Sequence, residues 1–212
     1  MDNLKYIFIV YLPGYAGNFL ARLLSLSKST VPVLPIEMLK NFDRIPNLNI
    51  DQRLQLYSFK DVRQQYQNWQ VYHREWITFY NHVDICERID NEFSHIVYSL
   101  HFPEFKKFNQ EITNIKNKEV FYVKLDLNRY KPWIEKSQLD LNFKYRLDEI
   151  ENYSKWSSLL DLNINLTKIL DNEVDYLEEY RNIQKFLNLD VYENEALILY
   201  KEWYDTRVRP YI

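Results

Sequence analysis

Short apolar runs alternate with amphipathic segments along this chain. The first run, Tyr6 to Leu12 (YIFIVYL), is β-branched and aromatic and carries no charge, which is typical of a strand buried on both faces of a parallel sheet. After the turn PGYAG, apolar residues return at helical spacing at positions 19, 20, 23 and 24, while Arg22 and Lys28 lie off this stripe. The pattern predicts a strand, a tight turn and a helix as the first unit.

The same alternation continues through the rest of the sequence. It predicts further strands at residues 95–100, 119–127 and 163–170, and helices at 51–69, 104–115, 144–162, 172–187 and 194–207. Asp171 is expected to cap the helix at 172–187, whose buried face should carry Val174, Leu177, Ile183 and Leu187. Strands that alternate with helices predict one α/β domain over residues 1–212, with a mostly parallel sheet between helices in three layers.

Charge and cysteine content narrow the possible partners. The 27 basic and 30 acidic residues are interspersed and give a net charge of −3, so neither a nucleic acid nor a membrane surface is expected as partner, whereas a small anion remains open. Cys86 is the single cysteine, which fits a reducing compartment and hence the cytoplasm. His73 and His82 are too far apart for a common metal motif, so no metal is expected. We make no prediction of oligomeric state.

Both glycines of the chain, Gly14 and Gly17, fall in the turn between the first strand and its helix. Such a turn lies at the carboxyl edge of the sheet, where open α/β folds bind ligands. Backbone N–H groups at a helix N-terminus attract phosphate or sulfate, and glycine lets the backbone approach an oxyanion closely. The turn therefore predicts an oxyanion cradle, with a tight connection that binds nothing as the alternative. It is not a Walker A loop, because Asn18 and Phe19 replace the required Lys and hydroxyl residue.

The order of these features resembles the sulfotransferases that use 3′-phosphoadenosine 5′-phosphosulfate (PAPS). In that family a P-K-S-G-T-T loop follows the first strand, and YLPGYAGNF stands in the same place here with one residue more. A later strand of the family ends in T-H-L-P with the catalytic histidine, and YSLHFPEF puts His101 and Pro103 in that pattern. A third strand, I-Y-V-x-R-N-P, leads into a helix with a serine, and EVFYVKLDLNRYKPWIEKS matches its strand and distance.

The resemblance implies a P-loop sulfotransferase-like fold and transfer of a sulfuryl group from PAPS to a hydroxyl of a sugar or small molecule. It implies His101 as the base that takes the acceptor proton, a task that suits a histidine at neutral pH. The nucleotide, as PAPS or its product 3′-phosphoadenosine 5′-phosphate (PAP), would be held without a metal. Its binding residues would be Gly14, Tyr15, Ala16, Gly17, Asn18, Phe19, Arg22, Lys124, Arg129 and Ser137.

Departures from the family pattern keep other functions open. The loop lysine is absent because Gly14 follows Pro13, and no glycine after Gly17 can form the C-terminal stretch that closes over the nucleotide. Relative to the family's arginine, Lys124 stands one place early and Arg129 four places late. The chain could therefore be a non-catalytic binding or assembly protein that retains the fold, or a P-loop kinase relative. His101 would then be a structural histidine, and the cations, Arg22 included, solvated surface charges.

Overall fold

The structure is a computed structural model that describes residues 4–11, 16–34, 43–60, 88–89, 92–101, 115–140, 152–153 and 162–211. Four strands in these segments form one parallel sheet in the order β2-β1-β3-β4. The strands are β1 Lys5–Tyr11, β2 His95–His101, β3 Lys118–Lys124 and β4 Asn163–Asn165. The helices are α1 Gly17–Leu24, α3 Ile50–Tyr57, α7 Leu127–Asp140, α9 Leu166–Asp171, α10 Glu173–Leu187 and α11 Glu193–Trp203, followed by a π-helical turn (Tyr204–Val208) and a 3-10 turn (Arg209–Tyr211).

The α/β class and the first unit agree with the sequence prediction. β1 runs into α1 across the turn, and β2 and β3 occupy the apolar runs expected to be strands. β1 is central and pairs with β2 on one side and β3 on the other, so Ile7, Phe8, Ile9 and Val10 have no solvent exposure. Full burial explains why this run contains no polar position.

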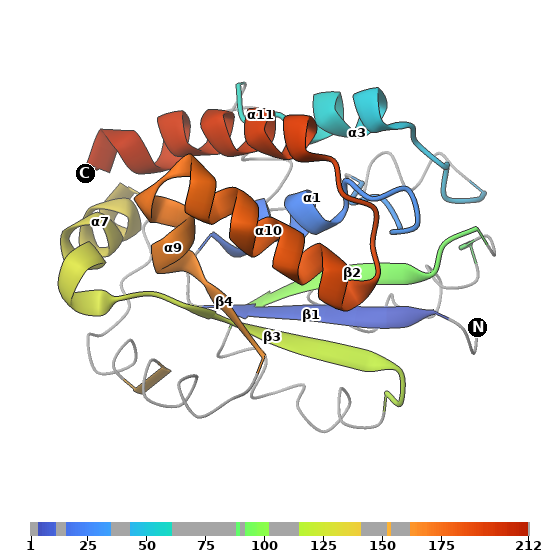
Figure 1. The fold of residues 1–212 in the computed structure, drawn as a ribbon, viewed down its shortest axis with the longest axis horizontal. Helices are drawn as coiled ribbons and strands as arrows, with labels where there is room; N and C mark the ends of the chain where they lie inside the picture. The colour runs from blue at the N-terminus through green and yellow to red at the C-terminus, as the bar shows by residue number, and fades with distance from the viewer. Residues whose placement is uncertain are drawn as a thin grey trace.

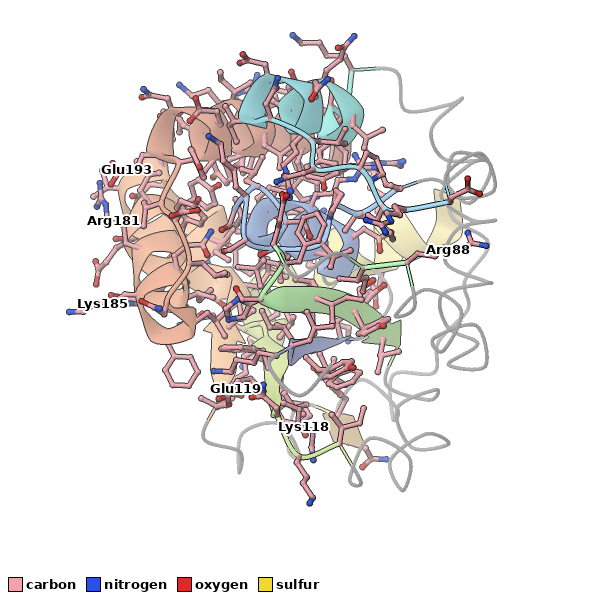
Figure 2. The ribbon with its side chains drawn as sticks, turned by 90° about the vertical axis from the view of Figure 1, so that its right-hand side faces the viewer. Arg88, Lys118, Glu119, Arg181, Lys185 and Glu193 are labelled. Atoms are coloured by element: carbon pink, nitrogen blue, oxygen red, sulfur yellow. The ribbon has the colours of Figure 1, made fainter. Side chains whose placement is uncertain are left out.

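The helices α1, α3, α10 and α11 gather on one side of the sheet, with α11 and α3 farthest from it (Figure 1). Figure 2 shows Arg181 of α10 and Glu193 of α11 together on the outer surface of this helical layer, where they form a 2.6 Å ion pair. The predicted helix at 104–115 and most of that at 144–162 lie outside the described residues. None of the described helices has the length and apolar character needed to cross a bilayer.

Aromatic rings join the two ends of the chain inside this layer. The ring of Phe19 in α1 stacks on Trp203 in α11 with 4.3 Å between ring centroids. Tyr176 of α10 stacks in the same way on Tyr200 of α11 at 4.2 Å, and its hydroxyl donates to the carbonyl of Ala196 at 2.7 Å. Because such pairs add to the free energy of apolar burial, they fix α11 across both α1 and α10.

Arg53 of α3 organises the loop that follows α1. Its side chain is fully buried, and its Nη1 donates to the carbonyls of Ser25, Ser27 and Thr30 at 2.6, 2.9 and 2.8 Å. Nε donates to the carbonyl of Leu48 at 2.9 Å. The Ser27 carbonyl also accepts from the backbone N–H of Thr30 at 3.1 Å. A loop has few backbone partners of its own, so the guanidinium group adds donors for carbonyls that helix or sheet hydrogen bonds do not reach.

Three sequence predictions for residues 163–187 are wrong: the length of the fourth strand, the residue that caps α10, and the burial of Val174. The apolar run at 163–170 is a strand only over Asn163–Asn165, because the Asn165 side chain accepts from the backbone N–H of Lys168 and starts α9. Asp171 ends α9, and Asn172 caps α10 by accepting from the N–H groups of Val174 and Asp175. Val174 is 74% exposed, since the buried stripe of α10 is made by Tyr176, Tyr180, Ile183, Gln184 and Leu187.

The helix predicted at 51–69 ends early, because the described residues 58–60 are not helical. α3 begins at Ile50 with a complete capping box, in which Asn49 and Gln52 each bind the other's backbone N–H, and it ends at Tyr57. Residues 61–69 of the expected helix lie outside the described residues, as do His73, His82 and Cys86.

Candidate functional site

The carboxyl edge of the sheet is where the topology would put a ligand site. The chain leaves β1 for β2 on one side and later adds β3 on the other side of β1. Connections that diverge in this way open a crevice at the strand ends, the usual ligand position in open α/β sheets. Tyr11 and His101 are register partners at this edge, so the residue expected to be the base ends the strand next to the one that enters the glycine turn.

Gly17 is the first residue of α1 and is glycine for a steric reason. A Cβ at this position would enter the ring of Tyr11, whose hydroxyl donates to Oδ1 of Asn18 at 3.2 Å. The ring of the last β1 residue therefore lies against the first turn of the helix. Close packing of a ring on the backbone accounts for this glycine without any ligand, as the alternative interpretation of the turn requires. Gly14 and Tyr15 lie outside the described residues.

Ala16 gives the helix an unusual start. It is the N-cap of α1 and has left-handed backbone angles, φ 56° and ψ 18°, which cost a non-glycine residue about 1 kcal/mol or more. Its carbonyl accepts from the N–H of Leu20 at 3.0 Å. Alanine has no side-chain oxygen, so the N-cap residue supplies no acceptor to the first-turn N–H groups.

The start of α7, which follows β3 at the same edge, has the opposite character. Oδ1 of Asp126 accepts from the N–H of Asn128 at 3.0 Å and from that of Arg129 at 3.4 Å. The Asp126 carboxylate thus occupies the N-terminus of this helix and places its own negative charge there. Of these two helices, α1 is the one whose N-cap residue brings no side-chain acceptor to the first turn.

Two side chains that the sequence assigned to nucleotide binding, those of Phe19 and Arg22, are buried in the protein interior. Phe19 has no solvent exposure and belongs to the aromatic stack with Trp203. Arg22 is 3% exposed, and its Nη1 donates to the carbonyls of Tyr57 and Ser58 at 2.8 and 3.3 Å. The interpretation of Arg22 as a solvated surface charge is therefore wrong. Its guanidinium lies 4.1 Å from the centre of the Phe59 ring, so it joins α1 to the end of α3.

The remaining cations assigned to the nucleotide, Lys124 and Arg129, lie at the end of β3 and in the helix that follows it. Lys124 is half-buried as the last residue of β3 and is the register partner of Asn165 in β4. Arg129, in the first turn of α7, is more than half exposed, and its Nη1 is 2.6 Å from Oδ1 of Asp171. The same carboxylate oxygen accepts from the hydroxyl of Tyr130 at 2.9 Å. Ser137 lies farther along α7, and its side chain is outside the described part.

Tyr130 keeps its proton in this group. Burial, with the hydrogen bond to Asp171 and the charge of that carboxylate, raises the pKa of Tyr130 to about 12. The hydroxyl therefore remains a donor to Asp171 at physiological pH. Arg129 and Tyr130 together hold Asp171, so an anion that approaches Arg129 has to compete with this carboxylate.

Sequence reasoning missed one polar group at the edge. The side chain of Tyr153 is fully buried, and its hydroxyl lies 2.8 Å from the carbonyl oxygen of Val10 and 3.0 Å from that of Val123. The pairing of β1 with β3 ends at Val10 and Tyr122, so the hydroxyl lies where the two strands stop pairing. No local pattern marks Tyr153 in the sequence, since its partners are more than a hundred residues away in β1 and thirty residues away in β3.

The other histidine of β2, His95, lies at the amino end of the strand, away from the candidate site. His95 begins the strand, and its Nδ1 is 2.8 Å from Oγ of Ser94. Burial and the nearby charge of Lys5 lower the pKa of His95, so its imidazole stays neutral at pH 7. Of the two histidines of β2, only His101 is at the carboxyl end of the strand, where the candidate site lies.

Comparisons with known proteins identify no relative that would assign a function to this site. No protein-family model, curated protein or solved structure matches the chain. Among the described residues, no group of three or more His, Cys, Asp or Glu side chains could hold a metal ion.

Proposed function

We propose that the protein binds an anionic nucleotide of the PAPS type at the carboxyl edge of the sheet and transfers its sulfuryl group to a hydroxyl of a sugar or small molecule. The observation that carries the proposal is the start of α1, which directly follows the central strand and has an N-cap without a side-chain acceptor. First-turn N–H groups and the helix dipole favour a sulfate or phosphate at such a position. A sulfotransferase-like, three-layer P-loop fold, in a reducing cytoplasm, is part of the proposal.

In the proposed reaction, His101 takes the proton of the acceptor hydroxyl as the acceptor oxygen bonds to sulfur. The bond between sulfur and the bridging oxygen breaks, and the electron pair stays on the 5′-phosphate of the product PAP. Backbone N–H groups of the turn stabilise that charge. Arg22 and Arg129 are bound by protein groups, so Lys124 is the cation that we assign to the leaving phosphate in place of the missing loop lysine.

Calorimetric titration with PAP tests the nucleotide site. We expect saturable heat for the wild type, and no heat at millimolar PAP would overturn the proposal. The His101→Ala variant should keep PAP binding and lose transfer, because the base acts on the acceptor and not on the nucleotide. Lys124→Met should weaken both, whereas Lys28→Met, an exposed lysine after α1, serves as the matched control.

A second candidate is a binding or assembly protein that retains the fold without catalysis. This function is favoured because three residues assigned to the nucleotide already have partners within the protein. Phe19 and Arg22 are buried in the interior, and Arg129 forms an ion pair with Asp171. This function allows PAP binding but no turnover. Sulfate transfer that disappears in His101→Ala would exclude it.

A further inference from the structure

Tyr153 lies where β1 and β3 stop pairing with each other. Its hydroxyl is within hydrogen-bond distance of the Val10 carbonyl in β1 and of the Val123 carbonyl in β3. The hydroxyl has one proton, so it donates to one carbonyl at a time or is shared between them. β1 and β3 no longer pair with each other here, although β1 pairs with β2 through Tyr11 and β3 pairs with β4 through Lys124. The buried hydroxyl thus replaces the missing contact between β1 and β3 and holds one peptide of each strand.

A continuous set of contacts leads from Tyr153 to the first turn of α1. The Val10 carbonyl belongs to the peptide that joins Val10 to Tyr11. The ring of Tyr11 in turn lies where a side chain of Gly17 would be, and its hydroxyl binds Asn18. The Val10–Tyr11 peptide, which the β1–β2 ladder also holds, thus connects the Tyr153 hydroxyl to the ring that packs on the first helical turn.

We propose that Tyr153 is a positioning residue for the oxyanion site, holding the end of β1 so that the first turn of α1 faces its ligand. This inference rests on the proposed function for the identity of the ligand, the 5′-phosphate end of a PAPS-type nucleotide. The hydroxyl itself does not touch the reacting atoms. It acts through Val10 and Tyr11.

The Tyr153→Phe variant tests the proposal, with Tyr176→Phe as its matched control. Both tyrosines are fully buried and donate to a backbone carbonyl, so both variants lose the same kind of bond. Tyr176 binds Ala196 between α10 and α11, away from the crevice. We expect the affinity for PAP to fall about tenfold in Tyr153→Phe, because a small displacement of a binding group is costly, and to change less than about twofold in Tyr176→Phe.

Amide hydrogen exchange provides a readout that needs no ligand. In Tyr153→Phe we expect faster exchange at Tyr11 and at residues 17–19, relative to Ile96 and Val97 in β2, and no such local change in Tyr176→Phe. Equal PAP affinity in wild type and Tyr153→Phe, or unchanged local exchange, would overturn the positioning role. If the wild type binds no PAP, the proposed function fails, and the exchange comparison still decides whether Tyr153 positions the turn.

A third measurement covers the case in which Tyr153→Phe does not fold. Fluorotyrosine at position 153 keeps the ring and the hydroxyl, so the fold is retained. Its fluorine resonance should shift on addition of PAP, while fluorotyrosine at position 176 should show no shift. A resonance at 153 that stays constant while PAP binds would contradict the proposal.

Discussion

At position 17 the side chain is missing because the ring of Tyr11 fills its space. A residue-scale contact of this kind makes glycine necessary whether or not an anion binds nearby. The contact also links the end of β1 to the start of α1 more tightly than the turn alone could. Substitution at Gly17 consequently reports on packing, and ligand binding has to be measured separately.

The Gly17→Ala variant should be less stable than wild type by about 1–3 kcal/mol, as expected when an extra methyl group enters a packed site. Urea denaturation gives the free energy of unfolding. In a Tyr11→Leu background the same substitution should cost less than about 1 kcal/mol, since the ring that it meets is gone. Equal costs in both backgrounds would show that another contact is responsible.

Arg53 is a second residue whose role depends on burial. Arg53→Met keeps much of the apolar volume but leaves the carbonyls of Ser25, Ser27, Thr30 and Leu48 without this donor. We expect a loss of about 3 kcal/mol or more in the free energy of unfolding. Arg53→Lys should also be destabilising, because an ammonium group lacks the planar fork. Little change in urea denaturation would contradict this role, and Arg181→Met, on the exposed face of α10, is the control.

Sequence patterns predicted those features that depend on neighbouring residues. The unbroken apolar run of β1 and the helical stripe of α1 are local, and both elements formed where expected. Arg22 was misjudged because its partners, Tyr57 and Ser58, are 35 and 36 residues away. Tyr153 was missed for the same reason. Tertiary contacts of this kind leave no periodic signal, and they determine which polar groups are available to a ligand.

At the scale of elements, Glu202 ties α11 to the end of α3. Its Oε2 accepts from the Ser58 hydroxyl at 2.7 Å and from the N–H of Phe59 at 2.9 Å, and its Oε1 is 3.1 Å from Nζ of Lys60. Burial by itself raises the pKa of Glu202, but these hydrogen bonds and the Lys60 charge outweigh it, so the pKa lies below its ordinary value. The ionised carboxylate is thus favoured by folding.

This lowered pKa predicts how the contribution of Glu202 depends on pH. The unfolded chain binds the proton more readily than the folded protein does, so the stabilisation is present at neutral pH and is lost as the pH falls through the folded pKa. Glu202→Gln should therefore lower the unfolding free energy at pH 7, and the difference from wild type should shrink between about pH 5 and pH 3. A difference that stays constant over this range, measured by urea denaturation, would contradict the assignment. Glu178→Gln, at an exposed position of α10, is the control.

At the scale of the whole molecule, the order of the strands determines which strand is the last to unfold. β1 is the strand that is paired on both sides along its buried length, whereas β4 contributes only three residues. Local openings of small free energy should therefore expose β4, while the amides of β1 should exchange only when the molecule unfolds globally.

Native-state hydrogen exchange with low concentrations of urea tests this expectation. The amides of Ile7 to Val10 should show the steep urea dependence of global unfolding, and those of Asn163 to Asn165 a shallow one. Faster exchange in β1 than in the exposed turns of α10 would contradict the central role of this strand.

The stack of Phe19 on Trp203 has a consequence for how the chain is made. A ribosome synthesises α1 before α11, so the ring of Trp203 can stack on Phe19 only after position 203 has been translated. Until then Phe19 lacks this stacking partner, and long-range contacts of this kind slow folding. The helix that begins at the candidate site is thus translated well before the contact that completes its packing.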